Sequence, residues 1–186
     1  MNRYLSRAIL LLLSVSAIAA PSSVVLPAST EELATPKQLG WVSDYGGLLS
    51  QTERDDLSRM PGQYFAQTRH QMVLFTVKTI GSESIDAFSR RTANAWGLGY
   101  KGTDDGILVT VAVNERKARI ELGQGMTAYI SDAAAADIMQ NALMPEIAKG
   151  NYYAGLKAGL GRLTESARAV AVPARAVHPQ FRAITA

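Results

Sequence analysis

The chain has 186 residues, of which 47% are hydrophobic and 19% are charged, and its formal net charge is +3. This composition is typical of a globular protein and excludes wholesale disorder, and the small net charge gives no support for nucleic acid as a partner. The sequence contains no cysteine, which excludes disulfides, thiolate nucleophiles, cysteine-ligated zinc and a lipid-modified cysteine.

Residues 1–19 have the order of features typical of a secretory signal peptide. Arg3 and Arg7 form a basic start, an apolar run follows, and the run ends in small residues up to Ala19. The alternative, a membrane anchor, needs about 20 apolar residues to span a bilayer, and this run is shorter. We therefore expect cleavage, a periplasmic or secreted protein with no stable membrane span, and a net charge of about +1 after removal of the two arginines.

Residues 20–39 are rich in Ser, Pro, Thr and Ala without a sustained period, and we interpret them as a linker. A helix is expected from about Gln51, because Ser50 and Glu53 form a capping-box pattern. Pro61 predicts a kink or a break in this helix, since an internal proline removes a backbone hydrogen bond and clashes with the preceding turn.

The middle of the chain alternates between strand and helix patterns. Residues 71–79 form an apolar run rich in branched side chains, which predicts a strand covered on both faces. A helix should run from about Ser84 to a C-cap at Gly97, and residues 106–113 and 117–122 should form a hairpin.

Two further helices are expected, one after Ser131 and one from about Asn151. Three strands and four or five helices in mixed order predict a single α/β domain over residues 40–170, with a small mixed β-sheet flanked by helices on both faces. Residues 171–186 are basic, and we expect a flexible tail, with contact to anionic surfaces as a weaker alternative.

Several common catalytic sites are not expected. Gly97, Gly99 and Gly102 have the spacing of a dinucleotide-binding loop, but a helix precedes them and a strand follows, which is the wrong order for that motif. The two histidines, His70 and His178, have no plausible catalytic partner by spacing, so neither a serine triad nor a zinc site is predicted.

Four aspartates lie beside glycines or helix starts in the expected loops: Asp44, Asp104, Asp105 and Asp132. Ca²⁺ binds six to eight oxygens from carboxylates, carbonyls and water, which flexible loops of this kind can supply. A local structural role is the alternative for each: an Asx-turn at Asp44, a turn at Asp105, and a helix start at Asp132. Because burial of a charge in an apolar sheet is costly, we expect the adjacent pair of carboxylates to remain at its rim.

Motifs in segments 41–57, 95–139 and 144–160 recur in the order found in the TPM domain family, which the chain resembles from about Trp41 to Leu163. The resemblance implies that the four aspartates form the acidic loop set with which calcium is associated. It also implies structural roles for Trp96, Gly106, Gly123 and Gly125. Family members include exported or membrane-tethered bacterial proteins and a plant thylakoid lumen protein described as an acid phosphatase.

Three functional hypotheses follow. The first is an exported Ca²⁺-binding module that acts in envelope or membrane-protein maintenance, with an unknown envelope or membrane protein as its partner. The second is a weak metal-assisted phosphomonoester hydrolase, an acid phosphatase whose catalytic residues the sequence does not identify. The third is a structural adaptor without a ligand, in which the carboxylates only form turns.

Overall fold

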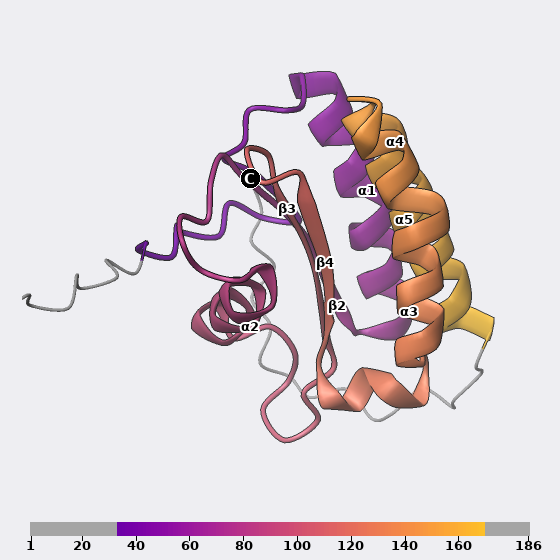
Figure 1. Ribbon diagram of the computed structural model, residues 1–186. Coiled ribbons are helices and arrows are strands. Elements are labelled where there is room, and N and C mark those ends of the chain that lie inside the picture. The colour runs from indigo at the N-terminus through magenta and orange to yellow at the C-terminus, as the bar shows by residue number, and fades with distance from the viewer. Residues whose placement is uncertain (1–32, 170–186) are drawn as a thin grey trace, which may run out of the picture. The chain divides into compact units, whose positions relative to one another are not determined.

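In the computed structural model, which describes residues 33–169, four strands form one mixed sheet in the order β1-β2-β3-β4 (Figure 1). The strands are β1 (Val42–Asp44), β2 (Gln71–Val77), β3 (Gly106–Ala112) and β4 (Lys117–Leu122). Strands β1, β2 and β3 are parallel, and β4 returns antiparallel to β3. The predicted hairpin is confirmed, whereas β1 was not predicted.

Helices cover both faces of the sheet, as the sequence predicted (Figure 1). On one face lie α1 (Gln51–Thr68), α3 (Asp132–Ile138), α4 (Met144–Ala148) and α5 (Tyr152–Ala169), and on the other lies α2 (Ile85–Trp96). A short 3₁₀ helix, Gln124–Ala128, follows β4, and a π-helical segment, Met139–Leu143, joins α3 to α4.

Alternate residues of β3 supply the two halves of the core. Ile107, Val109 and Val111 pack in the cluster under α1 and α5, whereas Leu108 and Ala112 pack in the cluster under α2. Every residue of β3 is buried, because successive side chains point to opposite faces and both faces are covered by helices.

The helix ends agree with the capping residues in the sequence. Ser50 and Glu53 form the complete capping box of α1, Ser84 caps α2, and Gly97 ends α2 in the left-handed conformation. The predicted break at Pro61 is wrong, because α1 continues through it to Thr68. Pro61 is buried, so packing against the core compensates for the hydrogen bond that proline cannot make.

Some predictions fall outside the described residues. These are the signal peptide (1–19), the linker up to residue 32, and the tail (171–186). Within residues 33–169, no helix has both the length and the hydropathy required to cross a bilayer.

Candidate functional site

The loop before β3 and the turn after β4 are held together by backbone hydrogen bonds. Gly123 N–H donates to Gly106 O at 2.8 Å, and Gly125 N–H donates to Asp104 O at 2.9 Å. Between them, Gln124 N–H donates to the Asp104 side chain at Oδ2, at 3.0 Å. Asp104 is therefore fixed at the edge of the sheet where β3 begins and β4 ends.

Two glycines permit this close approach. A Cβ at Gly123 would lie 2.1 Å from Asp104 O, and a Cβ at Gly125 would lie 1.9 Å from Thr103 O. Both distances are far shorter than a non-bonded contact, so a side chain at either position would push the two loops apart. Asp104 itself has φ of 48°, a conformation that aspartate adopts more readily than most residues.

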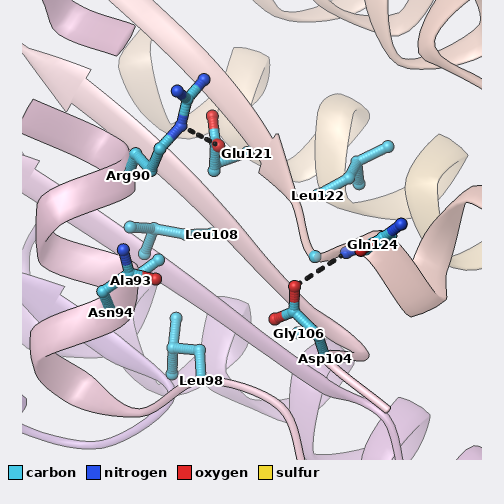
Figure 2. A pocket seen from close by; sticks show the side chains of 11 residues that line it. Arg90, Ala93, Asn94, Leu98, Asp104, Gly106, Leu108, Glu121, Leu122 and Gln124 are labelled. Atoms are coloured by element: carbon cyan, nitrogen blue, oxygen red, sulfur yellow. Dashed lines mark hydrogen bonds and ion pairs between the residues drawn. The ribbon is translucent and has the colours of Figure 1, made fainter. Parts of the chain in front are cut away.

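A cavity of about 280 Å³ opens beside Asp104, between α2 and β4 (Figure 2). Its polar lining residues are Arg90, Asn94, Asp104, Glu121 and Gln124. Arg90 Nε lies 3.2 Å from Glu121 Oε1 on one side, and Asp104 with its Gln124 hydrogen bond lies on the other (Figure 2). The cavity thus contains two carboxylates, one of which is neutralised by an arginine.

Asp105 is not among the residues that line this cavity and is buried, with a residue exposure of 8%. Its Oδ1 accepts hydrogen bonds from Tyr100 N–H at 2.8 Å and from Thr103 Oγ1 at 3.0 Å. Its Oδ2 lies 3.8 Å from His70 Nε2. Asp105 does lie at the rim of the sheet, immediately before β3, but it is buried there, and these donors offset the cost of its burial.

His70 has structural neighbours that its spacing in the sequence did not reveal. In addition to the contact of its Nε2 with Asp105, His70 has its Nδ1 3.4 Å from Tyr64 Oη. Its ring packs edge-on against Tyr129, with ring centroids 4.5 Å apart. Burial lowers the pKa of His70, and the negative charge of Asp105 opposes this effect. Burial also raises the pKa of Tyr64 to about 12, so this phenol is neutral at physiological pH.

Asp44 lies at the opposite edge of the sheet. It pairs with Thr76 near the end of β2, whereas Gly106, which follows Asp105, pairs with Gln71 at the start of β2. Five residues of strand separate these positions, which is roughly 16 Å at about 3.3 Å per residue. Asp44 therefore cannot share a metal ion with Asp104.

The Asp44 carboxylate has a local structural role, which was the alternative expected from the sequence. It accepts hydrogen bonds from Leu48 N–H at 3.1 Å, from Leu49 N–H at 3.0 Å and from the Thr76 hydroxyl, and Arg54 lies 3.6 Å away. These contacts position the segment that leads into α1. Since the side chain is 1% exposed, its oxygens are not accessible to a ligand.

Asp132 is exposed in the first turn of α3, where Ser131 is the N-cap. Its carboxylate lines a second cavity and not the one beside Asp104. Among residues 33–169, no three His, Cys, Asp or Glu side chains are close enough to hold a metal ion together. The four predicted ligands therefore do not form one donor set, because the fold separates them and buries two.

Sequence reasoning missed the other polar residues of the cavity. The predicted site residues did not include Glu121, Arg90 or Asn94. Their spacing along α2 and the alternation in β4 could have placed them on facing surfaces, but only after α2 had been assigned to this side of the sheet.

The family model of the TPM domain matches residues 42–166. This range includes every strand of the sheet, the loop before β3 and the turn after β4. The chain belongs to the TPM domain family. Its family motifs, including Trp96 and the glycines at 106, 123 and 125, lie in the matched region. No curated protein matches the sequence at a significant level.

Several solved structures share the fold of this TPM domain. The N-terminal domain of a P. gingivalis protein superposes with a TM-score of 0.68 at 23% identity, over 74% of this chain and 88% of that one. The BA42 protein from Bizionia argentinensis gives 0.58 at 16% identity, over 66% and 83%. The N-terminal domain of a Corynebacterium glutamicum protein gives 0.57 at 15% identity, over 82% and 98%.

Proposed function

We propose that this TPM domain is an exported binding module that binds a divalent cation, Ca²⁺ in the first instance, at the Asp104 edge of the sheet. The observation that supports this most is the state of the Asp104 carboxylate. Gln124 N–H holds Oδ2, and among the described residues no donor is hydrogen-bonded to Oδ1. The carboxylate is thus held in place by the loop while one oxygen remains available beside an open cavity.

The ligand set is smaller than the sequence predicted. Asp44 and Asp105 are left out because both are buried, with an exposed fraction of 1% for the Asp44 side chain and 8% for Asp105. Asp104 would be the principal ligand, with the Asn94 side-chain oxygen as a further ligand in the same cavity and water completing the shell, because both Glu121 oxygens already accept hydrogen bonds from Arg90 and Arg119. Since Arg90 neutralises Glu121, we expect weak binding, with a dissociation constant of about 10⁻⁴–10⁻³ M as in extracellular calcium modules.

Hydrolysis of phosphomonoesters is the second candidate, because the matching family model carries the word phosphatase in its name. The residues that line the cavity argue for binding instead. They include no Ser, Thr, Tyr, Cys or His, so the nucleophile would have to be water or a carboxylate, and only the carboxylates could act as general acid. The proposed role in the envelope requires export. An intact mass of the exported protein should show that the N-terminal residues have been removed.

Calorimetric titration and thermal melts with and without Ca²⁺ test the proposal. Wild type should release or absorb heat and melt at a higher temperature as Ca²⁺ rises, because a ligand that binds the folded state stabilises it by mass action. Asp104→Asn should lose both effects. Asp132→Asn is the matched control, since Asp132 lies outside this cavity, and it should behave as wild type.

A phosphomonoesterase assay on the same proteins distinguishes the two candidates. Calcium binding without turnover supports the binding module, and turnover that is lost in Asp104→Asn supports the hydrolase. If wild type shows neither heat nor a melting shift at millimolar Ca²⁺, the cation site must be withdrawn.

A further inference from the structure

Strand β4 forms one edge of the sheet. Within residues 33–169 its only sheet partner is β3, and no strand pairs with its outer side. The edge of a sheet presents backbone N–H and C=O groups that can pair with another strand. The sequence of β4, Lys-Ala-Arg-Ile-Glu-Leu, therefore bears directly on what could pair there.

The inward and outward backbone groups of β4 can be assigned. Gly123, the residue after β4, donates its N–H to the carbonyl oxygen of Gly106, the first residue of β3. Because backbone groups alternate in direction along an antiparallel strand, the odd-numbered residues of β4 face β3. Ala118, Ile120 and Leu122 then direct their N–H and C=O groups outward.

A groove borders this free edge. A cavity of about 390 Å³ runs along residues 119–122. It is bounded on its other side by Asp132, Ala135 and Ala136 of α3 and by Met139 at the start of the π-helical segment. The apolar residues of β4 belong to the same core cluster as Ala135 and Met139. A strand added here would place its apolar side chains next to α3.

The other face of β4 carries charges that lie near α2. Arg119 Nη1 lies 2.8 Å from Asp86 Oδ1, and Arg119 Nε lies 3.1 Å from Glu121 Oε2. Arg90 Nε lies 3.2 Å from Glu121 Oε1. A strand that fits this edge must therefore be apolar on the α3 side, and on the α2 side it must not place a like charge opposite Arg119 or Glu121.

We propose that the partner is a second copy of this chain, whose β4 pairs antiparallel with β4 so that Ile120 lies opposite Ile120 of the second copy. In this register the outward N–H and C=O groups of the two Ile120 residues face each other. Ala118 lies opposite Leu122 of the second copy. Arg119 lies opposite Glu121 of the second copy, and the two-fold symmetry repeats that pair.

The charges select this register. Sliding one strand by two residues places either Arg119 opposite itself or Glu121 opposite itself, and like charges directly opposite each other are destabilising. Sliding it by one residue places charged side chains among the apolar ones on the α3 side. Lys117, at the end of the strand, lies opposite Gly123 of the second copy, so the proposed register contains no like-charge pair.

Cysteine cross-linking of the full-length chain tests both the dimer and its register, because the chain has no cysteine of its own. Arg119→Cys and Glu121→Cys are prepared separately and then mixed under mild oxidation. The mixture should form a disulfide-linked dimer several-fold more than either variant alone, since positions 119 and 121 face each other only between copies. Gln67→Cys, at an exposed position on α1, is the matched control and should give only background with Arg119→Cys.

Sedimentation equilibrium of the wild-type chain measures its mass in solution. This test does not require that any variant folds. The mass should approach twice the monomer mass at high concentration and fall on dilution. A monomer at every concentration overturns the proposal, as does the absence of mixed cross-links between folded variants. Efficient cross-linking of either variant with itself overturns the register. None of these measurements involves Ca²⁺, so they are independent of the cation site.

Discussion

Asp105 and His70 face each other at the edge of the sheet where β2 and β3 begin, with Asp105 Oδ2 3.8 Å from His70 Nε2. His70 lies in the connection from α1 to β2, and Asp105 organises the loop before β3 through Tyr100 and Thr103. The contact thus joins the end of α1 to the loop that presents Asp104.

Replacing Asp105 should destabilise the domain. In Asp105→Ala, Tyr100 N–H and the Thr103 hydroxyl lose a buried acceptor, which should lower the free energy of unfolding by about 1–3 kcal/mol. Urea denaturation measures this change. Asp132→Ala, at an exposed position, is the control and should cost at most about 0.5 kcal/mol. Equal costs in the two variants would contradict the structural role assigned to Asp105.

Protonation of His70 should make stability depend on pH. Burial lowers the pKa of His70 in the folded state below its ordinary value of 6.5, so the unfolded state binds the proton more readily. The contribution of neutral His70 is fully present above pH 6.5 and is lost as pH falls through the lowered folded-state pKa. His70→Gln should therefore show a smaller loss of stability than wild type over this interval, measured as unfolding free energy against pH. Parallel curves for the two proteins would exclude His70 as the source.

The two loops should not tolerate a side chain at Gly125. Gly125→Ala would place Cβ 1.9 Å from Thr103 O, and the resulting displacement should cost about 1–3 kcal/mol or more. Gly161→Ala, within α5, is the control. A Cβ at this position would contact only the end of the Met60 side chain, at 3.6 Å. That change should stabilise the helix by about 0.5–1 kcal/mol. Thermal melts of both variants measure the difference, and a melting temperature of Gly125→Ala equal to that of wild type would refute the close approach.

The sequence by itself determined the elements whose signals are local. The capping box at Ser50 and Glu53, the C-cap at Gly97 and the hairpin of residues 106–113 and 117–122 each depend on residues that are close in the sequence, and all are confirmed. Family membership was also accessible from the order of short motifs. Pro61 shows the limit of such reasoning, because burial against the rest of the domain outweighs its local effect on α1.

Only the tertiary structure decided which side chains meet. β1 has three residues, too few for a strand pattern, and its parallel pairing with β2 is what places Asp44 at the edge away from Asp104. The contacts of His70 with Asp105 and of Arg90 with Glu121 join residues 35 and 31 positions apart, and they depend on strand direction, register and the face that each helix covers. Local periods of two or 3.6 residues assign a side chain to a face of its own element, whereas the packing of elements determines which faces and edges come together.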